Sequence, residues 1–85
     1  MSARLLFFAS LREQLGSSGE TLELPDAVHD VKGLRALLVA RGGQWQVALA
    51  DGRSLRVAVN QDLATWVTAI KDGDEIAFFP PVTGG

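Results

Sequence analysis

The chain has 85 residues, which is enough for one small domain but leaves little room for an internal catalytic cavity. Hydrophobic residues make up 47% and charged residues 21%, a balance typical of a folded globular protein. The formal net charge of −2 and the lack of a clustered basic stretch argue against a nucleic-acid partner. Cysteine is absent, so disulfides, thiolate catalysis and cysteine-ligated metals are excluded.

The chain opens with a predicted strand and a short predicted helix. Residues 4–8 form an apolar run of the length expected for a buried strand. Ser10 and Glu13 have the spacing of a capping box, which predicts a helix over 11–15 that ends at Gly16. Because the apolar run is too short for a signal or membrane segment, we expect a cytoplasmic protein with no membrane partner.

The main helix is predicted over residues 30–41. A half-buried strand precedes it, because polar and apolar residues alternate over 21–24. Asp30 is a suitable N-cap, apolar side chains then recur at helical spacing, and the glycines at 42–43 are typical of a helix stop. Gly33 costs this helix about 1 kcal/mol relative to Ala, and we interpret it as a point of close packing on the sheet.

The second half of the chain is predicted to be mostly strand. The Asp-Gly dipeptide at 51–52 is typical of a hairpin turn, here between 45–49 and an alternating strand over 55–59. A turn at 72–74 then precedes a last apolar strand over 75–79.

The order of these elements predicts an α+β fold, with a mixed sheet wrapped over one main helix. Residues 66–70 fit neither a helix nor a strand pattern clearly. Residues 1–81 are expected to form a single domain, and residues 82–85 a flexible C-terminal tail.

The sequence ends in Pro-Pro-Val-Thr-Gly-Gly, residues 80–85, and this ending is its most unusual feature. Two glycines would stand there by chance in about one of a hundred chains of this composition. Because glycine lacks a Cβ, Gly84 and the Gly85 carboxylate would fit a narrow slot in another protein. Pro80 and Pro81 stiffen the exit from the last strand, so the six residues could reach about 20 Å.

No set of internal residues predicts catalysis or metal binding. His29 is the sole histidine, and we interpret it as a solvated residue ahead of the main helix. Asp72, Asp74 and Glu75 could suggest a cation site, but their spacing matches no metal-binding loop, and a turn with surface acids explains them. The remaining candidate is the Gly85 carboxylate, a weak nucleophile that would need activation from outside.

Several motifs resemble those of a known family. They are Leu6-Phe7-Phe8-Ala9, Leu11-Arg12-Glu13, Val59-Asn60-Gln61 and, most specific of all, the run from Asp72 to Gly85. Over nearly its whole length the chain resembles the small subunits of molybdopterin synthase, which are ubiquitin-like sulfur carriers with a β-grasp fold. The departures lie mostly at 17–19, 33 and 66–70.

This resemblance implies a chemistry for the terminus. In that family an ATP-dependent adenylating enzyme activates the C-terminal glycine, here Gly85, and sulfur then replaces AMP to give a thiocarboxylate. Gly84 and Gly85 would be the working site that enters the large catalytic subunit and donates sulfur to the pterin precursor of the molybdenum cofactor. The chain would therefore not be an enzyme on its own. It would bind no cofactor, and ATP would be used by the activating enzyme at Gly85.

The resemblance also implies a contact surface for partner proteins. The implied contact residues are Phe8, Leu63, Phe79, Pro80, Pro81, Val82 and Thr83. Because Phe7 and Phe8 are neighbours, as are Phe78 and Phe79, strand alternation sends one of each pair away from the helix. An exposed aromatic face usually binds a partner. Core packing is the open alternative for Phe8, Leu63 and Phe79.

Other functions remain open from the sequence. A ubiquitin-like modifier would be adenylated in the same way but conjugated through Gly85 to lysines of other proteins. A sulfur carrier for thiamine synthesis or tRNA thiolation would use the same terminus. A free thiocarboxylate favours a carrier, whereas an isopeptide bond favours a modifier.

Overall fold

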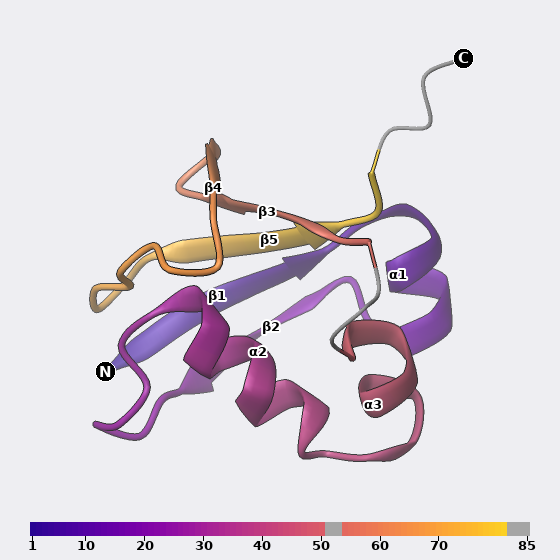
Figure 1. Cartoon of the computed structure of the whole chain (residues 1–85), viewed down its shortest axis with the longest axis horizontal. Helices are drawn as coiled ribbons and strands as arrows, with labels where there is room; N and C mark the ends of the chain where they lie inside the picture. Colours follow the sequence, from indigo (N-terminus) through magenta and orange to yellow (C-terminus); the bar gives the residue numbers. More distant parts are fainter. Residues whose placement is uncertain (51–53, 82–85) are drawn as a thin grey trace.

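The computed structural model describes residues 1–50 and 54–81, which form a five-stranded sheet packed against helices (Figure 1). In chain order the elements are β1 (Ser2–Phe7), α1 (Ala9–Leu15), β2 (Gly19–Glu23), α2 (Val31–Val39), α3 (Gly43–Leu49), β3 (Arg56–Val59), β4 (Asp62–Ala64) and β5 (Glu75–Phe79). The α+β class predicted from the sequence is therefore confirmed.

The strand order is β2-β1-β5-β3-β4, so β1 and β5 lie side by side in the centre of the sheet (Figure 1). These two strands run parallel, with Leu5 beside Ile76, and all other neighbouring strands are antiparallel. A parallel pair needs a long crossover connection, which here contains the helices and the other strands. The predicted mixed sheet is confirmed, and β5 spans the predicted residues 75–79.

Apolar side chains fill the space between the sheet and the helices. Strand alternation sends Leu5 and Phe7 of β1 and Ile76 and Phe78 of β5 to the same side, where each is at most 1% exposed. The Phe7 and Phe78 rings stack with their centroids 6.1 Å apart. Leu34 of α2 belongs to the same buried cluster. Because each such side chain stabilises the fold by about 1.5–3 kcal/mol, this layer is the main source of stability.

Helix α2 begins at the predicted N-cap. The carboxylate of Asp30 accepts a hydrogen bond of 2.7 Å from the backbone N–H of Gly33. The interpretation of Gly33 as a contact with the sheet is wrong. The atoms nearest to a Cβ placed at this position belong to Asp30 and Val28, in the loop that precedes the helix.

Residues 66–70, which the sequence pattern leaves unassigned, lie between β4 and β5 and contact the start of α2. The backbone N–H groups of Val31 and Lys32 donate hydrogen bonds of 3.0 and 2.8 Å to the carbonyls of Thr68 and Trp66. A helix leaves its first four N–H groups without partners inside the helix. The 66–70 segment therefore completes the cap that Asp30 begins.

The predicted capping box at Ser10 is wrong. Helix α1 begins at Ala9, so that Ser10 lies inside it, and the N-cap residue Phe8 makes no side-chain cap. Ala9 adopts a positive φ of 54° directly after β1, and this sharp turn starts the helix before Ser10 can cap it. The predicted end is confirmed, because Gly16 is left-handed and its N–H donates to the carbonyl of Arg12 at 3.0 Å.

The predicted hairpin after residue 45 is also wrong. Residues 43–49 form helix α3, which buries Ala48 and Leu49. Trp45 packs edge-on against Phe7, with 5.4 Å between the ring centroids. Positions 45, 48 and 49 share one helix face, and tertiary burial of this face decides the local structure. The Asp-Gly dipeptide at 51–52 lies outside the described residues.

The observed hairpin of this region joins β3 to β4. Asn60 and Gln61 form its two-residue turn with φ values of 51° and 72°, the positive angles that such a turn favours. The side-chain amide of Asn60 then donates to the carboxylate of Asp74 at 2.9 Å and accepts from the N–H of Glu75 at 3.0 Å. The hairpin turn is thereby tied to the start of β5.

Arg35 is the only charged residue that is buried in the described part of the chain, with 8% of its surface exposed. Its guanidinium donates hydrogen bonds of 2.6 Å to the carbonyls of both Leu49 and Ala50. Carbonyls at the end of a helix have no partner within the helix. Arg35 therefore connects α2 to the C-terminal end of α3, an arrangement that the sequence pattern did not predict.

Candidate functional site

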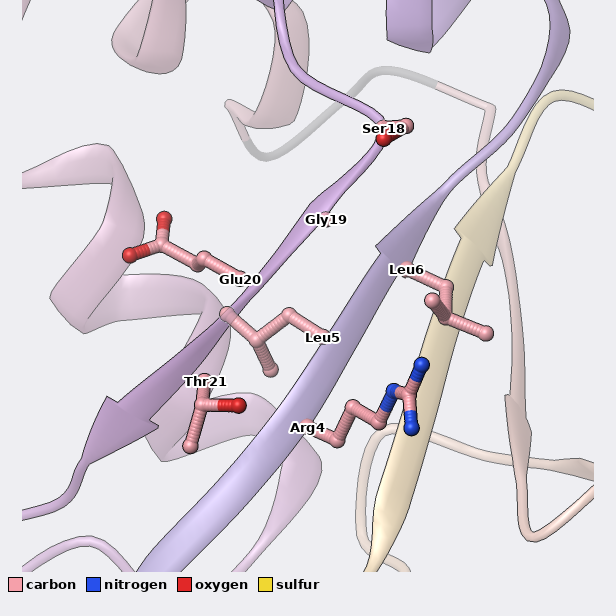
Figure 2. A pocket seen from close by; sticks show the side chains of 7 residues that line it. All are labelled: Arg4, Leu5, Leu6, Ser18, Gly19, Glu20 and Thr21. Carbon is pink, nitrogen blue, oxygen red and sulfur yellow. The ribbon is translucent and has the colours of Figure 1, made fainter.

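One face of the sheet is left open by the helices. Figure 1 shows α2 and α3 on the same side of the sheet. Leu5 is fully buried, whereas its neighbours Arg4 and Leu6 point the other way (Figure 2). We call this second side the open face. Its residues on β1, β3, β4 and β5, with Phe8 directly after β1, are Arg4, Leu6, Phe8, Arg56, Ala58, Leu63, Glu75, Ala77 and Phe79.

The strand register aligns four apolar residues across the open face. Leu6 of β1 pairs with Ala77 of β5, Ala77 with Ala58 of β3, and Ala58 with Leu63 of β4. Leu63 is 79% exposed, the largest fraction of any large apolar residue in this row. A contiguous apolar strip of this kind on a small domain is typical of a protein-binding surface.

The two phenylalanine pairs divide between the core and the open face, as strand alternation predicts. Phe7 and Phe78 are buried, whereas Phe8 is 45% exposed and Phe79 is half-buried. Core packing is therefore excluded for Phe8 and Leu63 and is only partial for Phe79. Their roles as contact residues stay predictions, and their exposure is the property that such a role requires.

Two prolines separate the end of β5 from the predicted tail at residues 82–85. Pro80 and Pro81 follow β5 directly and are half-buried. The predicted contact residues Val82 and Thr83 and the predicted working residues at 84–85 lie outside the described residues. Because β5 is a central strand, the chain leaves the sheet beside the aromatic end of the open face.

Three open-face residues were missed by sequence reasoning. They are Leu6, Ala58 and Ala77, which form the middle of the apolar row. Alternation counted back two residues from Phe8 and Phe79 puts Leu6 and Ala77 on the open face, whereas Ala58 is placed beside them only by the register of β3 with β5. The apolar row thus contains or adjoins three of the seven predicted contact residues, which are Phe8, Leu63 and Phe79.

A shallow hollow of about 250 Å³ lies beside this strip, between β1 and β2 (Figure 2). Gly19 is one of its lining residues, and a Cβ at this position would collide with the carbonyl oxygen of Leu5. The lining includes Arg4 and Glu20, but the carboxylate of Glu20 pairs with Arg41 at 2.6 Å. The hollow contains no paired acid and base, and we interpret it as an extension of the open face.

The acidic residues near the start of β5 hold the backbone together. The carboxylate of Asp74 accepts hydrogen bonds from the Asn60 side chain at 2.9 Å and the Lys71 N–H at 2.8 Å, and these bonds lower the pKa of Asp74. Asp72 accepts from the N–H of Ser2 at 2.8 Å. Across residues 1–50 and 54–81, no cluster of histidine and acidic side chains is suited to hold a metal ion. No helix in these ranges has the length and apolar character to cross a membrane.

Comparison with known proteins identifies the family. The sequence profile of the ThiS family matches residues 5–85. The chain belongs to the ThiS family. A relative of this ThiS-family chain is the molybdopterin synthase sulfur carrier subunit of Haemophilus influenzae. The two sequences are 46% identical over 81 residues, covering 95% of this chain and 96% of the relative.

Two solved structures resemble this ThiS-family chain over its full length. The crystal structure of SAMP1 from Haloferax volcanii has a TM-score of 0.78 and 31% identity, and the match covers 100% of both chains. The complex of subunits 1 and 2 of the molybdopterin-converting factor from Helicobacter pylori has a TM-score of 0.69 and 28% identity, again over 100% of both chains. The predicted ubiquitin-like β-grasp fold and the predicted family are both confirmed.

Proposed function

We propose that this ThiS-family chain is the sulfur carrier subunit of molybdopterin synthase and works through the carboxylate of Gly85. The observation that carries the proposal is the near full-length match to a relative of that name, whose alignment spans 96% of the relative. The fold supports it, because residues 80–85 continue directly from a central strand beside an exposed apolar face. A domain of this form presents a terminus to another protein.

The chemistry at Gly85 consists of two exchanges. The carboxylate attacks the α-phosphate of ATP and releases pyrophosphate, which converts a poor acyl donor into a mixed anhydride. A sulfur nucleophile then attacks the acyl carbon, AMP leaves, and the product is a thiocarboxylate. Transfer of its sulfur to the pterin precursor breaks the acyl C–S bond of Gly85, and water restores the carboxylate. Two such transfers build the dithiolene that later holds molybdenum.

The domain itself supplies presentation rather than catalysis. The described residues contain no nucleophile paired with a base, and His29 is exposed ahead of α2. The adenylating enzyme would bind ATP, and the large subunit would supply the catalytic side chains for sulfur transfer. This chain is thus the non-catalytic sulfur-donating subunit of the complex. A cytoplasmic location stays a prediction from the sequence.

The open face is the surface that we assign to the large subunit. The Helicobacter pylori structure is a complex of subunits 1 and 2 of the molybdopterin-converting factor, and the present chain is similar to one of these chains. We place Phe8, Leu63 and Phe79 in this contact. Residues 80–83 would then lead Gly84 and Gly85 into the catalytic subunit.

A deletion of Gly85 tests the proposal directly. Shortening the arm by one residue moves the reacting carbon by about 3.3 Å, whereas reaction geometry tolerates a misplacement of only about 1 Å. We expect the deletion to abolish thiocarboxylate formation with the activating enzyme, ATP and a sulfur source, as measured by intact mass. Gly84→Val should fail as well, because a β-branched side chain restricts the backbone that must enter a slot.

Thermal unfolding of both variants provides the control, and their melting temperatures should match that of the unmodified chain. Sulfur transfer by the deletion variant at the normal rate would overturn the carrier role of Gly85. A loss of folding in either variant would show instead that the terminus is part of the domain.

A second function is favoured by one observation. The solved structure with a TM-score of 0.78 is SAMP1, and related solved structures name SAMP1 as a small archaeal modifier protein. A modifier would form an isopeptide bond between Gly85 and a lysine of another protein. Mass spectrometry of the chain isolated from cells separates the two functions, because a free thiocarboxylate supports the carrier and a lysine conjugate supports the modifier.

A further inference from the structure

The open face has a cation at the point where the tail leaves the sheet. Arg56, the first residue of β3, is exposed and pairs in register with Phe79, the last residue of β5. Neighbouring strands lie about 4.8 Å apart, so the two side chains are adjacent on the open face. Pro80 and Pro81 follow immediately. Arg56 therefore stands beside the base of the tail.

The other arginine of the open face has a different environment. Arg4 pairs in the parallel register with Glu75, so that an opposite charge lies next to it. Asp74 directly precedes Glu75, so the acidic residues lie at the start of β5. The tail follows the other end of this strand, after Phe79. Arg56 instead has an aromatic neighbour. Within residues 1–50 and 54–81 the salt bridge formed is Arg41 with Glu20, and Arg56 takes no part in it.

A partner that covers Phe79 must also remove water from Arg56. Taking a guanidinium out of water is unfavourable unless an acceptor replaces the lost hydration. A carboxylate meets this need best, because its two oxygens match the planar fork of a guanidinium and fix the orientation of the pair. A pair at this position would also hold the base of the tail at one angle to the partner.

We propose that Arg56 binds a carboxylate of the large subunit and that this ion pair aligns the tail as it enters that subunit. This inference rests on the proposed function, since it names the chemistry of the partner surface facing the open face. The partner surface would thus be apolar opposite Phe79 and acidic opposite Arg56. Arg56 acts as a positioning residue, because its proposed role is to orient the complex and not to react with the pterin precursor.

Carbodiimide coupling of the complex tests the proposal, since this reagent joins an amine to a carboxylate that already contacts it. Arg56→Lys introduces the amine at the tail base, and the expected result is a one-to-one covalent adduct with the large subunit. Peptide mapping should place the bond at residue 56. Gln46→Lys, which puts an amine on the exposed surface of α3, is the matched control and should give no adduct at its new lysine.

Two results of the coupling would overturn the proposal. One is an adduct yield for Arg56→Lys no greater than that of the Gln46→Lys control. The other is a bond within a single chain between residue 56 and the Gly85 carboxylate, which would make the tail itself the acceptor.

Titration calorimetry of Arg56→Gln and Arg56→Glu with the large subunit gives a second readout. We expect the dissociation constant to rise about tenfold for Arg56→Gln and further for Arg56→Glu, with a weaker salt dependence in both variants. Sulfur transfer should show a raised KM for the carrier, because the complex forms less readily. Affinity and salt dependence equal to those of the unmodified chain would overturn the inference.

The failure of this inference and the failure of the proposed function give different results. If the Arg56 variants bind normally while Gly85 still forms a thiocarboxylate that donates sulfur, only the inference is overturned. If the unmodified chain forms no thiocarboxylate and no complex, both are overturned. Thermal unfolding of the Arg56 variants is the control. Their melting temperatures should match that of the unmodified chain, because Arg56 is exposed and is not part of the core.

Discussion

The guanidinium of Arg35 lies 4.4 Å from the ring centroid of Trp66. The same group donates hydrogen bonds to the last carbonyls of α3. A buried cation thus joins three segments, which are α2, the end of α3 and the loop after β4. Among the described residues, carbonyl dipoles and an aromatic face compensate its charge.

Arg35→Ala is expected to destabilise the domain by about 3 kcal/mol. The substitution leaves two carbonyls without their charged donor and removes the packing against Trp66. Chemical denaturation would measure the change in unfolding free energy. Arg12→Ala, at an exposed position of α1, is the control and should change this free energy by less than about 0.5 kcal/mol. Equal effects of the two substitutions would contradict the role given to Arg35.

Asp30→Ala is expected to cost about 1 kcal/mol of stability, because Asp30 caps α2 through the Gly33 N–H. Ser10→Ala tests the opposite expectation, since Ser10 lies inside α1 and caps nothing in the structure. Its effect should stay within about 0.5 kcal/mol. Thermal or urea unfolding of both variants measures the change in unfolding free energy. A larger loss of stability for Ser10→Ala than for Asp30→Ala would show that Ser10 does cap a helix.

Phe79→Ala is expected to weaken binding to the large subunit by about 2 kcal/mol or more, as for an aromatic residue at the centre of an interface. The loss of folding stability should be smaller, because Phe79 is only half-buried. Calorimetric titration and thermal unfolding of the same protein separate the two effects. Severe unfolding with unchanged affinity would move Phe79 into the core.

Phe78→Ala is the matched control for Phe79→Ala, because it changes the neighbouring residue on the buried side of β5. It should cost about 3–5 kcal/mol of folding stability through the cavity that it leaves. If the two neighbours gave the same loss of stability, the division of β5 into a core side and an open side would be wrong.

The stability of the domain should fall in acid partly through Asp74. Hydrogen bonds from Asn60 and Lys71 hold the pKa of Asp74 below its ordinary value of 3.8 in the folded state. The folded state then binds fewer protons than the unfolded state, so stability is fully present above the ordinary pKa. It is lost as the pH falls through the lower, folded value.

The Asp74→Asn variant should therefore show a smaller decrease in unfolding free energy between about pH 5 and pH 3 than the unmodified chain. Asn60→Ala should show a similar reduction, because it removes the main donor to the carboxylate. Urea unfolding at several pH values measures the slopes. An unchanged slope in both variants would contradict the assignment.

Local sequence signals predicted an element correctly where its apolar pattern and its capping residues indicate the same structure. The apolar run at 75–79 predicted β5, and the Asp30 cap predicted the start of α2. Helix α3 was missed because a strong turn dipeptide at 51–52 favoured a hairpin. Only contacts with Phe7 and the rest of the core show that the 45–49 face is helical. Strand β4 has three residues, too few for an alternating pattern to be recognised.

The candidate site divides in the same way. Strand alternation predicted that one member of each phenylalanine pair faces outward, and the family resemblance named Phe8 and Phe79. The alignment of Leu6, Ala58 and Ala77 in one row needed the register between strands, which a single sequence does not reveal. The burial of Arg35 could not be predicted either, because its acceptors lie on another helix. The residues themselves pointed to the Gly85 carboxylate by elimination, whereas the sulfur chemistry at Gly84 and Gly85 came from the family resemblance.

Strand β5 lies between β1 and β3, so it should be the last strand to lose its hydrogen bonds during unfolding. The C-terminal residues therefore follow the most protected strand of the sheet. Backbone amides of a strand paired along both edges exchange with solvent only when the whole domain unfolds, whereas short β4 at the sheet edge can open locally. A pull on residues 80–85 is therefore shared by the hydrogen bonds on both sides of β5. Drawing the terminus into a partner would move the domain as a rigid body and would not peel away its last strand.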